Sequence, residues 1–409
     1  MPSLPRSCTR PPVAIAIAAL ALLTLTTSAA LAAPKPATPP GKPSLSVMTR
    51  NLYIGADILA VATPTDLADF LTKARHFIEV VESTNFPERA EALAAEIADK
   101  KPDVVGMQEV YQLEYYGQDP AWQNGVAPFV NYLDLLLAAL GRHGAPYRAV
   151  AIVEEANILA PADLTDPYDG IDSYVRVLDR DVILVREGVT ASRVDPAGLC
   201  ASPDLVSVDG CNYAFVLEQP LPFGATVEFK RGFVAADVTK GDQTYRVFNT
   251  HLEVRTPAPD NPYSAIYQDT QATELQVALA SAPDGVRLVV TGDFNSSPED
   301  PLLPFGDGIS LYPPYQQLTR GVDIYGAPLG AAFLDAWTLR PGKPPGLTCC
   351  QDEDLLNPWS VLYERIDLIF SRETPSDVKA NPVGNSPEDK TPSGLWPSDH
   401  AGLVVRYVF

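Results

Sequence analysis

The stretch Thr291-Gly-Asp-Phe-Asn-Ser-Ser-Pro-Glu-Asp300 decides how the rest of the chain is interpreted. It follows the apolar run Val286-Arg-Leu-Val-Val290, which is typical of a short buried strand. Asp293 and Asn295 therefore lie where a core strand ends, and their spacing of two lets both side chains face the same side. Such a pair can orient a water molecule and bind a phosphoryl oxygen, or it can form an Asx-turn that only closes the strand.

Acids, amides and histidines recur at the ends of the other predicted strands. They are, in chain order, Asn51, Glu109, Asn249 with His251, Asp293 with Asn295, Asp367, and Asp399 with His400. Strand ends on one rim of a sheet sandwich can converge on one cavity even when they are far apart in sequence. We therefore expect these residues to share one site.

Together these motifs resemble the ordered motifs of the endonuclease/exonuclease/phosphatase superfamily, the deoxyribonuclease I-like group. The motifs are Asn51, Gln108-Glu109, Asn249-Thr-His251, Gly292-Asp-Phe-Asn295, Arg365-Ile-Asp367 and Ser398-Asp-His400. Each motif is weak alone, but their order and strand contexts match across nearly the whole chain. The resemblance implies an α/β (α+β) fold, a four-layer αββα sandwich of two packed, mostly antiparallel β-sheets flanked by helices.

The resemblance also implies a divalent metal ion, Mg²⁺ or else Mn²⁺ or Ca²⁺. Glu109 matches the family's metal-ligand glutamate, and its hard oxygens suit Mg²⁺. Asn51 matches the amide that helps to fix the metal, and Asp399 matches an acidic residue beside it. The plainer alternatives are a solvated strand-end acid for Glu109 and a turn asparagine for Asn51.

The catalytic roles implied by the resemblance fall on five residues. His251 would contact the scissile phosphate, Asp293 and Asn295 would align the attacking water and bind a phosphate oxygen, and His400, oriented by Asp367, would accept or deliver a proton. Two alternatives remain at this point. His251 could be a core histidine, and Asp367 could be a buried strand acid bonded to the neighbouring arginine of its motif.

Two further residues are weaker candidates for binding the substrate. Arg180 could bind a phosphate oxygen, but Asp179-Arg-Asp181 could equally form a salt bridge where a strand begins. Asn249 is a candidate because it stands in the same motif as His251.

The N-terminus predicts export. Arg6 and Arg10 precede an apolar run, and Ala30-Leu-Ala32 offers a cleavage site, so residues 1–32 are typical of a secretory signal peptide. Residues 33–43 form a Pro-rich linker, and residues 44–409 form the predicted catalytic domain. The expected location is extracellular, with cleavage near Ala32.

Charge and cysteines constrain the function further. The formal net charge is −21, and loss of the two signal-peptide arginines would lower it to −23. Such a chain lacks the basic footprint of a tight, sequence-independent nucleic-acid binder. Cys200 and Cys211 could form a disulfide. Cys349 and Cys350 are adjacent, which is awkward for a mutual bond, and a metal site there lacks a histidine nearby in the sequence.

The sequence predicts a secreted, divalent-metal-dependent phosphoesterase that hydrolyses phosphodiester bonds, with DNA or RNA slightly favoured as substrate. The alternatives are a sphingomyelinase-like phospholipid phosphodiesterase and an inositol-phosphate phosphatase. Membrane contact is expected only of a lipid-acting enzyme, for which residues 111–122 are the aromatic-rich candidate. A non-catalytic binding module on the same fold is the alternative from another class. No protein partner is implied, and we expect a monomer.

Local patterns predict the remaining elements. Helices are expected at 65–82, 87–100, 130–140 and 263–281, and a hairpin is expected around Lys240-Gly-Asp242. The segment 157–174 is rich in Pro, Asp and Gly and predicts a surface loop. The segment 306–330 is expected to be rich in loops.

Overall fold

Two mixed β-sheets form the centre of the computed structural model, which describes residues 42–56, 58–117, 128–165, 169–255, 264–340, 342 and 345–409. The first sheet runs β19 (Asp377–Val383), β20 (Gly402–Val408), β1 (Ser44–Asn51), β2 (Val104–Gln108), β6 (Ser173–Arg186), β3 (Gln112–Tyr116) and β4 (Pro128–Asn131), with β5 (Tyr147–Ala162) paired to β6. The second runs β17 (Leu334–Asp335), β18 (Asp367–Ser371), β14 (Arg287–Asp293), β13 (Gln243–His251), β12 (Gly232–Lys240), β9 (Gly210–Asn212) and β8 (Val206–Ser207), with β7 (Thr190–Arg193) paired to β12.

Most neighbouring strands are antiparallel. The two parallel pairs are β1 with β2 and β13 with β14. These four strands are almost wholly buried, as expected for strands covered on both faces. Each parallel pair brings two strand ends to the same edge of its sheet, which is how distant motifs become neighbours.

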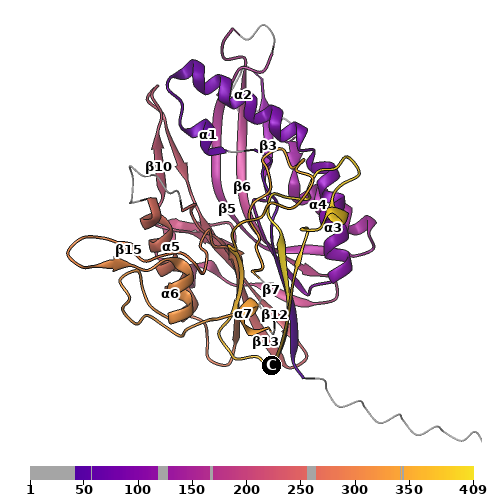
Figure 1. The fold of residues 1–409 in the computed structure, drawn as a ribbon, viewed down its shortest axis with the longest axis vertical. Coiled ribbons are helices and arrows are strands. Elements are labelled where there is room, and N and C mark those ends of the chain that lie inside the picture. The colour runs from indigo at the N-terminus through magenta and orange to yellow at the C-terminus, as the bar shows by residue number, and fades with distance from the viewer. Residues whose placement is uncertain are drawn as a thin grey trace, which may run out of the picture. The chain divides into compact units, whose positions relative to one another are not determined.

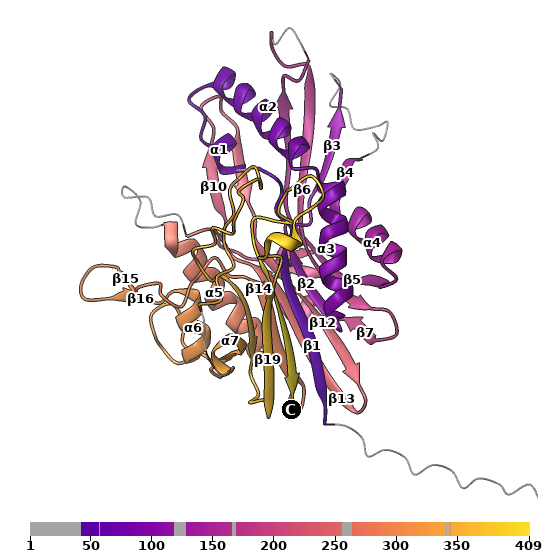
Figure 2. The same cartoon turned by 45° about the vertical axis from the view of Figure 1, so that its right-hand side comes forward.

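Helices cover the outer faces of both sheets (Figures 1 and 2). Those over the first sheet are α1 (Ile58–Ala62), α2 (Leu67–Ser83), α3 (Phe86–Lys100) and α4 (Tyr132–Arg142). Those on the side of the second are α5 (Ser264–Ala280), α6 (Pro314–Arg320) and α7 (Ala336–Leu339). Along α3, buried residues recur at positions 86, 90, 93, 94 and 97, the spacing that places them on one helical face. The predicted four-layer αββα sandwich is confirmed.

Three apolar cores hold these layers together. One lies between the first sheet and its helices, one between the two sheets, and one between the second sheet and its helices. The core between the sheets also contains a polar link. Asn249 on β13 accepts a hydrogen bond from Gln108 Nε2 (2.6 Å) and donates to the backbone oxygen of Met107 (2.9 Å) on β2. Gly106 makes this approach feasible, because a Cβ there would lie 2.3 Å from Asn249 Oδ1.

Two sequence-based loop predictions are partly wrong. The segment 157–174 is not all loop, because β5 continues to Ala162 and pairs with β6 as far as Ser173. The segment 306–330 contains α6, which begins with Pro314 and ends before Gly321 in the left-handed conformation. The two shorter hairpins, β10 (Leu217–Pro220) with β11 (Thr226–Phe229) and β15 (Leu303–Pro304) with β16 (Ser310–Leu311), were not predicted.

Four of the five cysteines form two pairs, and Cys8 lies outside the described residues. Cys200 and Cys211 form a disulfide with an S–S distance of 2.03 Å, and Cys349 is bonded to its neighbour Cys350. The predicted signal peptide at 1–32, the linker up to residue 41 and part of the aromatic stretch at 111–122 lie outside the described residues. No helix in the part of the chain that the structure describes is long and apolar enough to cross a membrane.

Candidate active site

A cavity of about 960 Å³ opens at the rim where β2, β13 and β14 end. The predicted site residues that line it are Glu109, His251, Asp293, Asn295, Asp399 and His400. Asn51 and Asp367 lie directly behind this wall, each fully buried. The structure therefore brings together eight of the ten residues singled out in the sequence.

Asp293 is the last residue of β14, so the strand extends beyond the apolar run. Its Oδ1 accepts a hydrogen bond from the backbone N–H of Asn295 (2.9 Å), and Asn295 has φ of 47°. The Asx-turn is thus present, and it turns the chain so that both side chains line the cavity. Asp293 Oδ2 accepts a hydrogen bond from Asn51 Nδ2 (3.0 Å). Burial, together with repulsion from Asp367, raises the pKa of Asp293 to about 7 against the attraction of His400.

His400 stands at the centre of three carboxylates, which we call the His400 cluster: Asp293, Asp367 and Asp399. Its Nδ1 lies 2.8 Å from Asp367 Oδ2, and its Nε2 lies 3.8 Å from Asp293 Oδ2 and 3.9 Å from Asp399 Oδ1. Burial alone would lower the pKa of His400, but the three carboxylates raise it well above its ordinary value. The three carboxylates therefore favour the imidazolium form of His400, which lines the cavity.

Asp367 holds the imidazole in place. It is the first residue of β18, its Oδ2 is bonded to His400, and its backbone N–H donates to Thr348 Oγ1 (3.1 Å). The alternative pairing with the arginine of its own motif does not occur, because Arg365 Nη2 donates to Asp335 Oδ2 (2.7 Å) instead. Asp367 therefore has the orienting position that the sequence predicted.

His251 is neutral and has a defined tautomer. Burial and the neighbouring Arg231 lower its pKa well below the ordinary value. Arg231 Nη1 lies 3.0 Å from His251 Nδ1. Because a guanidinium can only donate, Nδ1 is the acceptor of this contact, which favours the tautomer with the proton on Nε2. Nε2 also lies 3.2 Å from Asn295 Nδ2, which donates to the backbone oxygen of Leu252. This Nε2–H lies 3.6 Å from Asp293 Oδ2 and can donate to a phosphoryl oxygen in the cavity.

Arg231 is a site residue that the sequence reasoning missed. It lines the cavity from the turn before β12, and the next residue, Gly232, pairs with His251 on β13. Its guanidinium lies 3.7 Å from Asp179 Oδ2, 3.9 Å from Glu155 Oε2 and 3.7 Å from Glu253 Oε1. We call this group the Arg231 cluster. The signal that could have revealed it is the strand pairing, which places Arg231 beside a motif histidine.

The residues predicted to hold a metal ion have the right chemistry for Mg²⁺. Asp399 lies at the cavity wall with its side chain 17% exposed, and desolvation together with repulsion from Glu109 raises its pKa to about 6 against the attraction of His400. Two carboxylates lining one cavity offer the hard oxygens that Mg²⁺ prefers and a charge that a cation would offset. Asn51 has a positioning contact, because its Nδ2 donates to Glu109 Oε1 (3.1 Å). The backbone N–H of Ile54 donates to Glu109 Oε2 (2.8 Å).

Two predicted substrate-binding residues lie away from the cavity. The Arg180 guanidinium donates to the backbone oxygen of Val110 (3.0 Å) and to Asn131 Oδ1 (2.9 Å). Asn249 is enclosed between the sheets. Neither lines the cavity, so the prediction that they bind substrate is corrected to a structural role for both.

The vicinal cysteines lie at the cavity wall. Cys350 Sγ is 4.0 Å from His400 Nε2, so a histidine does lie near this pair. A metal site there was discounted because no histidine lies nearby in the sequence. That reason is wrong, because the fold brings His400 close to the pair. Since the two sulfurs are bonded to each other, they are not thiolate ligands in this state.

Comparison with known proteins adds a family match. The model of the Endonuclease/Exonuclease/phosphatase family matches residues 81–400. Curated proteins give no match. Solved structures with a similar fold include an endonuclease/exonuclease/phosphatase family protein from Leptotrichia buccalis C-1013-b, with 16% identity and a TM-score of 0.46, covering 89% of this chain and 100% of that one. D. rerio TDP2 complexed with a single strand DNA product has 17% identity and a TM-score of 0.44, covering 89% and 98%. An endonuclease/exonuclease/phosphatase from Beutenbergia cavernae DSM 12333 has 19% identity and a TM-score of 0.43, covering 90% and 72%.

Proposed function

Because this chain belongs to the endonuclease/exonuclease/phosphatase family, we propose that it hydrolyses phosphodiester bonds with the help of a divalent metal ion. The observation that carries the proposal is the His400 cluster facing Glu109 across one cavity. In this arrangement Glu109 and Asp399 would hold the ion, with Asn51 fixing the glutamate. Bound there, Mg²⁺ would polarise a phosphoryl oxygen and offset developing charge.

The protein's own residues divide the work of water attack on phosphorus. Asp293, with its pKa near 7, is suited to accept a proton from the attacking water at neutral pH. His251 and Asn295 donate hydrogen bonds to phosphoryl oxygens, where charge develops in the transition state. His400, kept protonated by Asp367, presents its Nε2–H as a further donor and as a proton source for the leaving oxygen.

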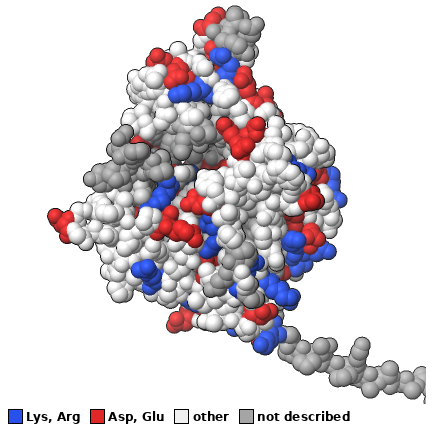
Figure 3. Space-filling model, in the orientation of Figure 1, with Lys and Arg blue, Asp and Glu red and all other residues white. Residues whose placement is uncertain are grey.

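Nucleic acid remains the substrate that we propose to test first, followed by sphingomyelin-type phospholipid and inositol phosphates. The chain's charge of −21 opposes tight binding of a long polyanion. On the face drawn in Figure 3, Lys and Arg are interspersed with Asp and Glu. Local cations at Arg231 and at the metal would have to draw the phosphate into the cavity.

Export is part of the proposal and rests on residues 1–32. N-terminal sequencing of the protein recovered from the culture medium should give a start after Ala32. Recovery of the uncleaved chain from the cytoplasm alone would contradict it.

The decisive experiment measures phosphodiesterase activity with and without Mg²⁺ or Mn²⁺ on plasmid DNA, RNA, sphingomyelin and inositol phosphates. EDTA should abolish turnover, and Glu109→Ala should nearly abolish it at saturating metal while the far-ultraviolet circular dichroism stays unchanged. Glu79→Ala, an exposed glutamate on α2, is the matched control and should keep full activity. A metal-independent enzyme, or full activity in Glu109→Ala, would refute the assignment, and a non-catalytic binding module would show no turnover of any substrate.

A further inference from the structure

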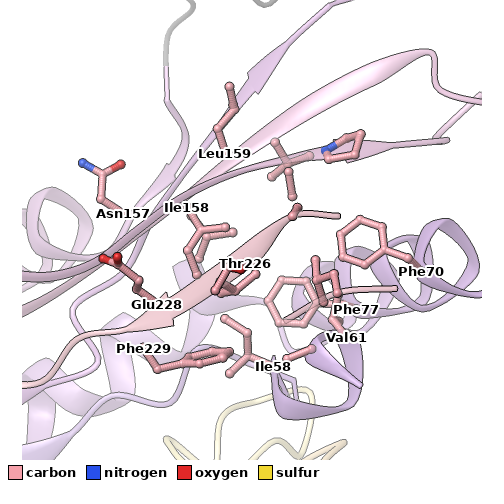
Figure 4. A pocket seen from close by; sticks show the side chains of 18 of the residues that line it. Ile58, Val61, Phe70, Phe77, Asn157, Ile158, Leu159, Thr226, Glu228 and Phe229 are labelled. Carbon is pink, nitrogen blue, oxygen red and sulfur yellow. The ribbon is translucent and has the colours of Figure 1, made fainter. Parts of the chain in front are cut away.

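A second cavity, of about 360 Å³, lies between α1, α2, β5 and the β10–β11 hairpin (Figure 4). Its lining includes Ile58, Phe70, Phe77, Ile158, Val227 and Phe229. Figure 4 shows the side chains of the two helices facing those of β5 and β11, with the polar Asn157 and Glu228 gathered at one end. We call this cavity the apolar pocket.

The apolar pocket is too large to be a packing defect. Well-packed cores leave few voids bigger than a water molecule, and this volume falls within the range of about 300–1,000 Å³ that is usual for ligand sites. The hairpin that forms one wall is anchored across it. Phe223, between β10 and β11, meets Phe70 of α2 edge to face, with ring centroids 5.2 Å apart. The walls are thus held by contacts that leave the space between them open.

The apolar pocket adjoins the catalytic cavity. Ile58, the first residue of α1, lines both. Two successive residues line different cavities: Lys230 lines the apolar pocket, and Arg231 lines the catalytic cavity. The two cavities therefore share a wall at Ile58, which is where a substituent on a phosphate bound in the catalytic cavity would enter the apolar pocket.

Resting on the phosphodiesterase function proposed above, we propose that the apolar pocket binds an alkyl chain ester-linked to the scissile phosphate. The walls give an alkyl chain what it needs, which is apolar surface without hydrogen-bond demands. The polar residues that line the apolar pocket are Glu155, Asn157, Thr226, Glu228 and Lys230, and the other residues of the lining are apolar. A nucleobase would have to bury its polar edges mostly against apolar side chains, which is unfavourable. A substrate with one phosphate and an alkyl chain also avoids repulsion between a polyanion and this acidic protein.

Two small esters test the proposal without micelles or membranes. The probes are p-nitrophenyl methyl phosphate and p-nitrophenyl octyl phosphate with Mg²⁺, both below the concentration at which the octyl ester aggregates. Each buried methylene can raise affinity up to roughly four-fold, so kcat/KM for the octyl ester should exceed that for the methyl ester about 10- to 100-fold. Equal values for the two esters would overturn the proposal.

Variants locate the effect in the apolar pocket. Val227→Asp places a charge in its wall and should reduce the octyl advantage to within about three-fold, while turnover of the methyl ester stays unchanged. Val277→Asp is the matched control, because Val277 is exposed on α5 and lines neither cavity. If Val227→Asp does not fold, Thr226→Trp fills the same space from an exposed strand position. An octyl advantage that survives in a folded pocket variant would overturn the proposal.

Calorimetry separates failure of the pocket from failure of the enzyme. Octyl phosphate should bind the wild-type protein at least about ten-fold more tightly than methyl phosphate, whether or not either ester is hydrolysed. If octyl phosphate binds in this way but neither ester turns over, the phosphodiesterase function fails and the apolar pocket stands. If both esters turn over but octyl phosphate shows no such preference, the apolar pocket fails and the function stands.

Discussion

The His400 cluster and the Arg231 cluster lie side by side, and each surrounds one cation with three carboxylates. The cation distances are similar, 2.8–3.9 Å around His400 and 3.7–3.9 Å around Arg231. The central group differs, because an imidazolium can release its proton whereas a guanidinium stays charged. His251 stands between the clusters, bonded to Arg231 on one side and facing Asp293 on the other.

The difference shows how a protein can use carboxylates for two purposes. Around a histidine they can support proton transfer, and around an arginine they hold a permanent charge in place. The His400 cluster lines the cavity and can exchange protons with a substrate. In the Arg231 cluster, Glu155 and Asp179 are at most 2% exposed, and the Arg231 guanidinium fixes the tautomer of His251. We expect changes in the first cluster to affect mainly catalysis. Changes in the second should lower stability and also disturb the contact that orients His251.

Removal of the exchangeable cation should have the largest effect. His400→Ala deletes a proton donor and leaves three carboxylates facing one another, so we expect kcat to fall about 10³-fold, within the usual range for general acid–base groups. Steady-state kinetics at saturating Mg²⁺ measure this. His143→Ala removes a histidine on the far surface, beside Glu91, and should leave kcat unchanged. A loss of less than ten-fold in His400→Ala would contradict the assigned role.

Removal of the fixed cation should instead lower stability. Arg231→Met leaves the surrounding carboxylates buried without their counter-ion, and loss of one partner in a buried ion pair typically costs about 3–5 kcal/mol of unfolding free energy. Urea denaturation measures this cost. The control is Arg246→Met, which breaks the partly exposed pair with Asp237 and should cost at most about 1 kcal/mol. Equal costs in the two variants would erase the distinction between the clusters.

A smaller effect should appear in the pH dependence of stability. Burial raises the pKa of Asp179 to about 6 and those of Glu155 and Asp181 well above their ordinary values. Between pH 4 and these raised values the folded state binds more protons than the unfolded state, so stability falls as pH rises. We expect the metal-free protein to lose about 1–3 kcal/mol between pH 5 and pH 8.

Asp181→Asn tests this interpretation, since it removes one titrating carboxyl and keeps the side-chain shape. The decrease in stability between pH 5 and pH 8 should become shallower in the variant. An unchanged slope would show that the pH dependence originates elsewhere, for example in the His400 cluster.

The sequence predicted the fold and most of the residues that gather at the catalytic cavity because the strand ends carry strong local signals. An apolar run followed by Asp, Asn or His marks a strand end, as at Asp293 and His251. Such a pattern indicates which residues lie at strand ends. The two-sheet fold then brings these strand ends together at one rim. Asp367 and His400 also lie at strand ends, and they were predicted to pair. The prediction required only that both strand ends lie on the same rim.

The residues that sequence reasoning missed depend on contacts across strands. Arg231 lies in a segment without any motif, and only the register of β12 with β13 places it beside His251. Asn249 was assigned to the substrate because it belongs to a motif, but side chains alternate along a strand, and its side chain points between the sheets. The extension of β5 to Ala162 likewise depends on β6, which is its hydrogen-bonded partner.

The order of the strands has a consequence for assembly of the site. Asp399 and His400 precede β20, the strand that inserts between β1 and β19. Asn51 ends β1, so the earliest and latest parts of the site meet across one strand pair. Ser398 on the segment before β20 donates a hydrogen bond to the backbone oxygen of Asn51, 347 positions earlier in the chain. The candidate site therefore closes only when two segments from opposite ends of the domain have paired, so its assembly depends on one of the longest-range contacts of the fold.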